Sequence, residues 1–262
     1  MILFTHSNLE VAIKNVTQEF ISNGSPVIAK SWQSIQRPED MYEVQRISFS
    51  AMIPDSYKEL QKQIKPNLPW AEDHFQERIG GKPLNPGEQY KNWPFYKNNK
   101  ANDTFRTEQE KFSHTYMERI WPKKAHEFEG AGNLSGIRYE YGDFNDVITL
   151  LLKDPTTRQA YLPIWFPEDT GTSFKQRVPC SLGYLFTCRG SLLNVTYYIR
   201  SCDYLRHFKD DVYLACRKVQ WLLTQLQGHD SGNWANIRPG IFTMHIESLH
   251  VFLREYNLLK SL

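Results

Sequence analysis

Two strand-length runs separated by a two-residue turn constrain the fold of this chain more than any other feature. Residues 180–189 (CSLGYLFTCR) and 192–200 (LLNVTYYIR) are rich in β-branched and aromatic residues, with Gly190-Ser191 between them. This pattern predicts a β-hairpin or two neighbouring strands. Residues 208–226 then repeat apolar side chains at helical spacing, and residues 241–246 again have strand composition. A sheet with a long helix packed on it is an α+β arrangement, which is the fold class that we expect.

Shorter patterns predict the remaining elements. Ser7 and Glu10 have the spacing of a capping box before a helix over residues 8–22, and Asp143 begins a helix that the sequence KDP ends. Residues 247–262 predict a closing helical or mixed segment. Strand composition is found in three further segments: residues 26–33, 44–53 and 159–165.

The chain shows no internal repeat and no linker-like segment. We therefore expect one domain over residues 1–262. Residues 66–100 stand out within it because they are rich in Pro, Asn, Gly and Trp. Such a composition predicts a long ordered loop or an insertion beside a binding site, with a short helix over residues 70–79.

The charge balance excludes some classes of partner. Lys and Arg number 31 against 29 Asp and Glu, a formal charge of +2, so the chain has no bulk field that would steer it onto nucleic acid or an anionic membrane. No apolar run approaches the ~20 residues that span a bilayer, and residues 1–10 lack the apolar core of a signal peptide. We expect a cytoplasmic protein that binds neither nucleic acid nor membrane.

The four cysteines are spaced by eight, fourteen and fourteen residues, which fits no zinc or redox motif. We therefore expect no metal site and no disulfide scaffold. Cys180 differs from the others because it follows Pro179 at the start of a predicted strand, where a side chain can point into a cleft. A lone cysteine in such a place is more often a buried core residue, so its context has to decide.

A polar cluster marks the end of the next predicted strand. The sequence YIRSCD sets Arg200, Ser201 and Asp203 together. The arginine fork and the serine hydroxyl can donate to a phosphate, while the carboxylate remains available as an acceptor. A surface salt bridge is the ordinary alternative for such a cluster.

Four blocks of sequence in this order carry a family resemblance: DPTTRQAYLPIWFP, PC, YIRSCD and SLHVF. Their order and spacing over roughly residues 142–252 resemble the thymidylate synthase superfamily. The resemblance implies a mixed β-sheet packed with helices, with the sheet at a homodimer interface. It also implies a pyrimidine nucleoside monophosphate as substrate and 5,10-methylenetetrahydrofolate as cofactor.

The resemblance also implies roles for the matched residues. Cys180 would be the thiolate that adds to C6 of the pyrimidine, and Arg200 with Ser201 would hold the 5′-phosphate. Arg158 matches an arginine that crosses to the phosphate of the partner subunit, so its use requires a homodimer with shared active sites. Asp203 matches a carboxylate on the folate side of the site.

Further roles follow from weaker matches. His250 matches a residue that contacts a sugar hydroxyl, and Tyr116 lies where the family has a tyrosine near the nucleophile. The family's general acid/base is a glutamate three residues before an aromatic residue, and PWAEDHF offers Glu72 in that position. Glu77 is the reserve candidate, and either glutamate could simply be a solvated helix charge. His74 and His114 have no partner visible in the sequence and receive no role.

The chain also departs from the family pattern. Gln159 replaces the second arginine of a doubled pair, Ser181 replaces the histidine after the catalytic cysteine, Ile199 replaces a glutamine, and Phe252 replaces a sugar-binding tyrosine. The sequence ends ten residues after Phe252, without the long tail that closes a synthase site over folate. These departures favour a reaction that water ends over a reductive methyl transfer.

Asp211 is the most informative departure. Thymidylate synthases carry an asparagine at this place, whose amide matches O4 and N3–H of uracil. A carboxylate that accepts from N4–H₂, and that is protonated where it faces N3, matches the edge of cytosine better. Phage deoxycytidylate hydroxymethylases and related cytidylate hydroxymethylases resemble the chain at this position. A helix-start aspartate that interacts with the macrodipole is the structural alternative.

We therefore predict folate-dependent C5 hydroxymethylation of dCMP or CMP, with Cys180, Glu72 and Asp211 as catalytic residues. A uridylate-directed thymidylate synthase or dUMP hydroxymethylase is the nearest alternative. A non-catalytic nucleotide-binding or RNA-binding relic of the fold is the second alternative, and the intact set of Cys180, Arg200, Ser201 and Asp203 argues against it.

Overall fold

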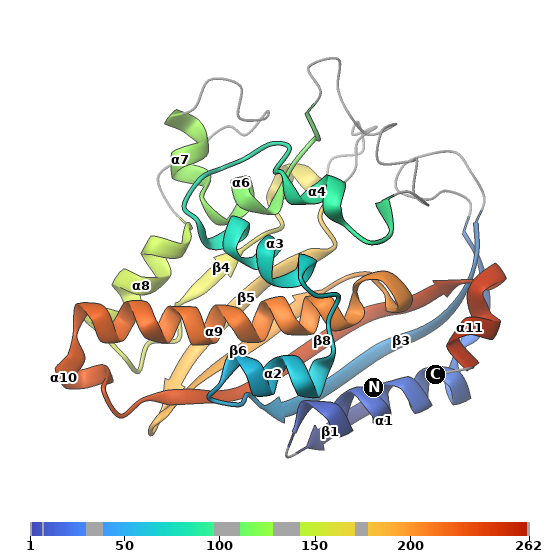
Figure 1. Cartoon of the computed structure of the whole chain (residues 1–262), viewed down its shortest axis with the longest axis horizontal. Coiled ribbons are helices and arrows are strands. Elements are labelled where there is room, and N and C mark those ends of the chain that lie inside the picture. Colours follow the sequence, from blue (N-terminus) through green and yellow to red (C-terminus); the bar gives the residue numbers. More distant parts are fainter. Residues whose placement is uncertain are drawn as a thin grey trace.

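Eight strands join in one mixed sheet, and helices cover one of its faces (Figure 1). The computed structural model describes residues 2–6, 8–29, 39–96, 111–127, 142–170 and 178–260. In this part of the chain the strand order is β1-β3-β8-β6-β5-β4, with β2 paired to β3 and β7 paired to β8. The predicted α+β class is confirmed.

The strands differ widely in length, and the two longest, β3 and β8, lie next to each other and run antiparallel. The β6–β8 and β1–β3 pairs are parallel, and the β5–β6 and β4–β5 pairs are antiparallel. The strand bounds are β1 Ile2–His6, β2 Ser25–Ala29, β3 Glu39–Met52, β4 Tyr161–Pro163, β5 Ser181–Arg189, β6 Leu192–Ile199, β7 Cys202–Asp203 and β8 Arg238–Phe252.

The predicted hairpin is present as β5 and β6. Arg189 pairs with Leu192 next to the turn, where Gly190 has a positive φ of 57° that suits a residue without a Cβ. Along β6 the side chains alternate between buried and half-buried. One face of the hairpin therefore lies against the core and the other faces away from it.

Helices of very different length cover the sheet, and α9 is the longest. Within the described residues no helix is long and apolar enough to cross a membrane. The helix bounds are α1 Leu9–Asn23, α2 Tyr57–Ile64, α3 Trp70–Ile79, α4 Gln89–Asn92, α6 Tyr116–Ile120, α7 Pro122–Glu127, α8 Phe144–Lys153, α9 Lys209–His229, α10 Ser231–Trp234 and α11 Tyr256–Lys260.

The helix predicted over residues 208–226 corresponds to α9. A short π-helix, η4 (Tyr204–Phe208), leads into it directly from β7. The apolar side chains of α9 include Val212, Ala215, Val219 and Leu222, which are fully buried. Because they recur at helical spacing, they form one stripe that packs into the core beneath the sheet.

Two helix starts show how local sequence sets the ends of elements. Asp143 caps α8 in a capping box with Asp146, as the sequence predicts for its start. The expected capping box of Ser7 and Glu10 is wrong for α1, because Asn8 is the N-cap and its side chain accepts from the amide of Val11. Ser7 itself lies outside the described residues.

Other predicted bounds are corrected by strand pairing. Residues 247–252, predicted as part of a closing helical or mixed segment, continue β8, because they pair with residues 41–45 of β3 and with β7. A 3₁₀ turn, η5 (Leu253–Glu255), and α11 then follow. The strand predicted over residues 159–165 is shorter, and of the strand predicted over 26–33 the described part, β2, ends at Ala29.

The Pro-, Asn- and Trp-rich segment is described up to residue 96. It contains α3, which matches the predicted short helix, and α4. Asn67 fixes its start to α9, because its amide and its side chain both donate to the buried Asp210 carboxylate at 2.8 Å. Further along, Trp93 stacks on His207 of η4 with 4.8 Å between ring centroids. The segment therefore lies against the same chain region that carries Asp203 and Asp211.

Candidate active site

The hairpin of β5 and β6 brings Cys180 and Arg200 together. Cys180 directly precedes β5, Arg200 directly follows β6, and the Arg200 amide donates to the Cys180 carbonyl at 3.0 Å. The Cys180 side chain is half-buried, and all four cysteines, which lie in the described residues, are outside disulfides. A thiolate is the nucleophilic form of cysteine, and a neighbouring cation favours it. The structure thus places the PC and YIRSCD motifs side by side.

The side chain of Arg200 supports the segment before Cys180. Nε donates to the carbonyl of Pro179 at 2.9 Å, and Nη2 donates to that of Val178 at 3.3 Å. The guanidinium lies over the Trp165 ring, 5.4 Å from its centroid. Ser201 follows as a half-buried residue. This end of β6 therefore has a guanidinium and a hydroxyl in adjacent residues, beside the cysteine.

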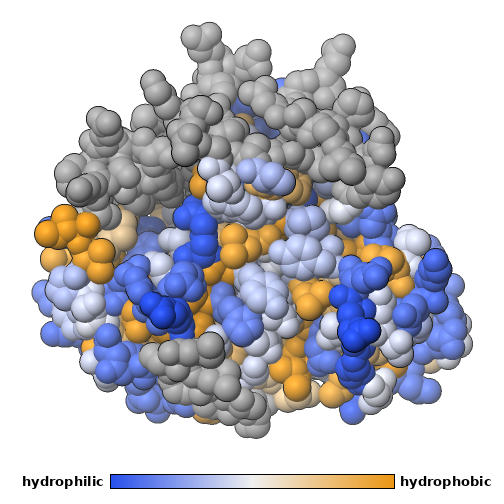
Figure 2. Space-filling view, turned by 180° about the vertical axis from the view of Figure 1, so that it is seen from behind, coloured by the Kyte–Doolittle hydropathy of each residue, from blue (hydrophilic) through white to orange (hydrophobic). Residues whose placement is uncertain are grey.

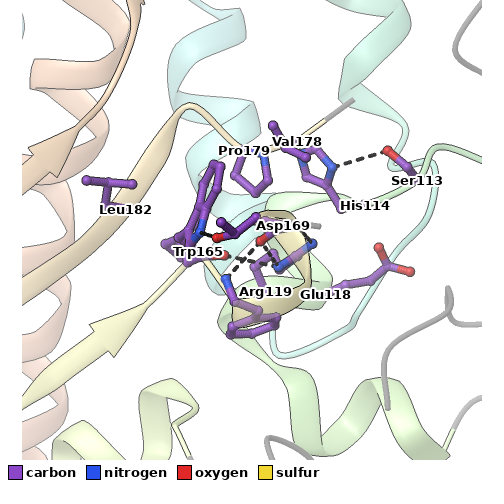
Figure 3. Close-up of polar contacts among 12 residues, drawn as sticks. Ser113, His114, Glu118, Arg119, Trp165, Asp169, Val178, Pro179 and Leu182 are labelled. Atoms are coloured by element: carbon purple, nitrogen blue, oxygen red, sulfur yellow. Dashed lines mark hydrogen bonds and ion pairs between the residues drawn. The ribbon is translucent and has the colours of Figure 1, made fainter. Parts of the chain in front are cut away.

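A buried ion pair braces the Trp165 turn (Figure 3). Arg119 of α6 forms two bonds to Asp169 of η3 (Pro167–Thr170), from Nη1 to Oδ2 at 2.7 Å and from Nη2 to Oδ1 at 2.9 Å. Arg119 also donates to the Ile164 carbonyl, and Asp169 accepts from the Phe166 amide. Because both side chains are almost fully buried, the pair ties α6 firmly to the turn on which Arg200 rests.

Tyr116 reaches the cysteine from the first residue of α6. Its hydroxyl accepts from Ser181 Oγ at 3.3 Å, and Ser181 Oγ also lies 2.6 Å from the Tyr197 hydroxyl. Burial raises the pKa of Tyr116, and the charges of Cys180 and Asp211 raise it further. Tyr116 is thus joined through Ser181 to the residue next to Cys180, and its role near a nucleophile stays a prediction.

Asp211 lies in the first turn of α9 and faces the same region. Its Oδ2 accepts from Cys202 Sγ at 3.7 Å. Burial raises the pKa of Asp211 to about 7; the Arg78 charge opposes this shift, and the Asp210 charge adds to it. Both the carboxylate and the carboxylic acid are thus present near neutral pH. Such a group can accept a hydrogen bond or donate one.

A fully buried lysine lies two turns along α9 from Asp211. Lys218 donates from Nζ to the Leu214 carbonyl at 3.2 Å, and Nζ lies 4.4 Å from the centroid of the Tyr184 ring. Burial lowers the pKa of Lys218 well below its usual range, and so does the Arg78 charge. Sequence reasoning missed this residue, although a lysine inside an apolar helical stripe was a visible signal.

Three polar side chains of α3 form a second group that the sequence did not predict. Arg78 Nε donates to His74 Nε2 at 2.9 Å, and His74 Nδ1 lies 3.3 Å from Glu77 Oε2. The Arg78 guanidinium lies over the ring of Tyr116, 4.2 Å from its centroid. Burial and the Arg78 charge lower the pKa of His74 to about 4. His74, which the sequence left without a partner, is thus a neutral link between Glu77 and Arg78.

The two glutamates proposed as general acid/base are both engaged in this structure. Glu72 accepts from Arg217 Nη2 at 2.8 Å and from the Tyr213 hydroxyl at 2.5 Å. Burial raises its pKa, but the bonds from Arg217, Tyr213 and Gln76 outweigh burial, so the net pKa is lowered. Glu77 accepts from the amides of two residues near α4 as well as from His74. The catalytic role of either glutamate stays a prediction.

Asp203 and His250 are neighbours across the β7–β8 pair. Asp203 caps η4 by accepting from the amides of Leu205 and Arg206, and it forms an ion pair with the Arg206 side chain at 2.9 Å. His250 is 7% exposed, and burial lowers its pKa. Its buried Nδ1 has no hydrogen-bond partner in the described part of the chain. A buried polar atom of this kind suits a ligand hydroxyl.

Arg158 lies apart from these residues in the same chain. It is exposed in the turn between α8 and β4, next to Thr156, whose carbonyl accepts from Arg189 at the end of β5. Cys180 precedes the other end of that strand, and nine strand residues span roughly 30 Å. Arg158 therefore cannot reach the surroundings of Cys180 within one subunit.

The described residues contain no group of three or more His, Cys, Asp or Glu side chains that could hold a metal ion. The side chains nearest Cys180 and Asp211 are instead tyrosines, arginines and a lysine. The chemistry that such a set can perform is nucleophilic addition, proton exchange and stabilisation of negative charge.

Comparisons with known proteins bear on the fold. No protein-family model matches the chain, and no curated protein matches it. Among solved structures, the thermostable thymidylate synthase A from Bacillus subtilis matches with a TM-score of 0.63 and 14% sequence identity, over 97% of this chain and 83% of that chain. At this identity the likeness shows the fold: the chain has the thymidylate synthase fold.

Proposed function

We propose that the chain catalyses folate-dependent C5 hydroxymethylation of a cytosine nucleotide, dCMP or CMP. The observation that carries the proposal is the buried Asp211 carboxyl group beside the Cys180 region, at the place where a thymidylate synthase has an asparagine. Its raised pKa supports the choice of base, because one protonation state accepts from N4–H₂ and the other donates to N3 of cytosine.

The reaction begins at Cys180. Its thiolate adds to C6 of the pyrimidine, which makes C5 nucleophilic towards a one-carbon group. Arg200 and Ser201 bind the 5′-phosphate at the end of β6, and His250 Nδ1 meets a sugar hydroxyl. Asp211 donates its proton to N3 as electrons move towards the edge of the ring. Transfer of the one-carbon unit would join it to C5, release tetrahydrofolate and send the C5 proton to solvent, which leaves a methylene group on C5. Water adds to that carbon, and elimination of the thiolate from C6 restores the ring.

The residues around η4 fit a folate. Trp93, Phe95 and His207 form an aromatic group next to Asp203, with 5.6 Å between the rings of Trp93 and Phe95. Trp93 Nε1 is buried and has no acceptor among the described residues, so a donor is available to a flat heterocycle. When bound there, 5,10-methylenetetrahydrofolate supplies the one-carbon unit.

The uncovered face of the sheet supports a homodimer (Figure 2). Met52, Tyr161 and Ile241 are 37–41% exposed on this side, and apolar residues reach the surface between polar ones in the view from behind. A hollow of about 280 Å³ is lined by strand residues that include Leu182, Tyr198 and His245. An open sheet face of this kind needs a partner surface, and a second copy of the chain supplies one.

The position of Arg158 supports shared active sites. Because it cannot serve the site of its own chain, Arg158 can add to the phosphate contacts of Arg200 and Ser201 only in the site of a partner subunit. Its exposure in the turn before β4 leaves it available for such a contact.

Release of tritium from C5-labelled nucleotides tests the proposed function. Labelled dCMP, CMP and dUMP are incubated with and without 5,10-methylenetetrahydrofolate, and the nucleotide product is identified by mass. We expect release from a cytosine nucleotide and a product that is heavier by CH₂O. Cys180→Ser should abolish release and keep nucleotide binding, whereas Cys188→Ser at the far end of β5 should react like the parent chain.

The uridylate-directed reaction is the second candidate, because an ionised Asp211 would accept from N3–H of uracil. Release from dUMP alone would establish that reaction in place of the first. A chain that binds these nucleotides and releases no tritium from any of them would refute both.

A further inference from the structure

Arg78 is a buried cation to which the proposed mechanism gives no role. It lies near the C-terminal end of α3 and is only 5% exposed. Its Nε donates to His74, but neither Nη1 nor Nη2 makes a hydrogen bond to any residue in the described part of the chain. The two Nη nitrogens therefore keep donors that a bound ligand can accept from.

The surroundings of Arg78 fix its orientation. His74 accepts at Nε2 from Arg78, so the histidine proton is on Nδ1 and faces Glu77 Oε2. The His74 ring stacks on Trp70 with 4.9 Å between centroids, and Glu77 is held by the amides of Glu88 and Gln89. The hydrogen bond to His74 therefore fixes the Nε edge of the guanidinium, and the two Nη atoms point away from His74.

The Nη side lies next to the reacting groups. The Arg78 guanidinium is stacked on Tyr116, whose hydroxyl bonds to Ser181, the neighbour of Cys180. The Arg78 charge also acts on Asp211 more strongly than that of any other cation does. Arg78 thus contacts Tyr116 and acts on Asp211, and Tyr116 is joined by a hydrogen bond to Ser181, the residue after Cys180.

We infer that Arg78 is a catalytic residue whose Nη–H groups stabilise the negative charge that forms on the pyrimidine when Cys180 adds to C6. This inference rests on the proposed function and deepens it. When the S–C6 bond forms, the C5=C6 π bond breaks. Its electron pair spreads from C5 to N3 in cytosine or to O4 in uracil, which is the edge that Asp211 faces.

In the absence of folate the addition of Cys180 to C6 is reversible, and the hydrogen on C5 exchanges with solvent before the thiolate leaves. C5 takes a proton from solvent and loses its original hydrogen, the thiolate leaves C6, and the double bond forms again. No oxidant or reductant is consumed. Donors that are already in place when the charge develops lower the barrier to addition more than they tighten binding of the neutral ring.

The experiment compares Arg78→Met, Arg78→Lys and a control, Arg238→Met, which changes an exposed arginine at the start of β8. Tritium release from the C5-labelled nucleotide without folate reports addition, and titration calorimetry gives the Kd. We expect Arg78→Met to slow release roughly 10²- to 10³-fold with a Kd within about threefold of the parent value. Arg78→Lys keeps the charge but loses the fork, so release should slow about tenfold. The control should match the parent chain.

The outcomes separate this inference from the proposed function. A parent chain that releases no tritium overturns both. A parent chain that is active, together with an Arg78→Met variant that exchanges at the same rate, overturns only the role of Arg78. So does a variant whose Kd rises as much as its rate falls, because Arg78 would then only bind the ground state. If Arg78→Met does not fold, Arg78→Lys decides, and an unchanged rate in that variant overturns the role.

Discussion

Burial changes what two ionisable groups of α9 can do, and it shifts their pKa values in opposite directions. Asp211 is held partly protonated near neutral pH, and Lys218 is driven towards its neutral form. Each shift has the sign expected when the charged form loses water. The Arg78 charge makes Asp211 more acidic and also makes Lys218 harder to protonate. These groups therefore titrate as a coupled set, and a change in one alters the charge of the others.

Exchanging Asp211 for asparagine should move the base preference towards uracil. In Asp211→Asn the amide offers N–H to O4 and C=O to N3–H, whereas cytosine presents the opposite pattern. A mismatched buried pair costs ~1–3 kcal/mol, which corresponds to roughly ten- to a hundredfold in relative kcat/KM. Measuring kcat/KM for dCMP, CMP, dUMP and UMP on both chains checks this. An unchanged ratio of kcat/KM between cytosine and uracil nucleotides would mean that Asp211 only stabilises the start of α9 and does not contact the base.

The same residue makes a prediction about stability and pH. The pKa of Asp211 is raised from 3.8 to about 7 by folding, so between these values the folded chain binds more protons than the unfolded chain. Its contribution to the unfolding free energy is therefore present below pH 4 and is lost as pH rises to 7. Relative to the parent chain, Asp211→Asn should gain stability over this window, by at most about 1.4 kcal/mol per pH unit. Urea unfolding at pH 5, 6, 7 and 8 measures it, and parallel curves would contradict it.

Sequence reasoning predicted the residues that short motifs mark and missed the residues that only folded contacts bring together. Cys180 and Arg200 follow from the hairpin, which local composition predicts. The contact of Arg78 with Tyr116 joins α3 to α6 and depends on how two helices pack, which no local pattern encodes. For the same reason the sequence could not show that Arg217 and Tyr213, on α9, would engage Glu72.

At the scale of elements, hydrophobic periodicity predicted the helices whose bounds depend on their own residues. The helices α3, α8 and α9 begin and end close to the expected residues, because their apolar stripes, and for α8 also its capping box, lie within their own sequence. The end of β8 and the whole of β1 were not predicted, because they are strands through pairing with β3. Strand formation in such segments depends on distant residues more than on composition.

Removing Arg119 should show how far the site depends on the contact between α6 and η3. Arg119→Met leaves the Asp169 carboxylate buried without its partner, which should lower the unfolding free energy by about 3–5 kcal/mol. Urea denaturation measures the loss. Arg119→Met combined with Asp169→Leu should recover part of it, because no unpaired charge then remains buried.

A matched control for this prediction is Arg189→Met, which removes an exposed arginine that bonds only to backbone carbonyls. It should change stability by less than about 1 kcal/mol. Equal losses in Arg119→Met and Arg189→Met would show that the ion pair does not brace the turn.

At the scale of the whole molecule, the helices of the described residues leave one face of the sheet uncovered. On this face Ser48 bonds to His245 at 2.7 Å, Ser50 bonds to Thr243 at 2.8 Å, and Tyr198 stacks on His245. The sequence predicts strands here but does not indicate which face of the sheet the helices leave open, because both faces carry polar and apolar side chains. The difference between the covered and the open face depends on how the helices pack in the folded chain.

Mixing two inactive variants should restore activity if the active sites are shared. Cys180→Ser lacks the nucleophile and Arg158→Ala lacks the arginine that serves the neighbouring subunit. In a mixed dimer one site has both groups, so up to about one quarter of the parent activity should return after random reassociation. Tritium release before and after mixing measures it. Full activity of Arg158→Ala alone, or a monomer with full activity, would contradict shared sites.

The order of the strands also determines when the sheet can be completed during synthesis. β8 lies between β3 and β6 in the sheet, yet it follows both of them in the sequence. Until residues 238–252 have emerged, β3 and β6 each expose an edge with unpaired backbone groups, although both strands have already been made. Until β8 pairs with β3 and β6, the nascent chain therefore exposes two strand edges with which other nascent chains can pair and aggregate.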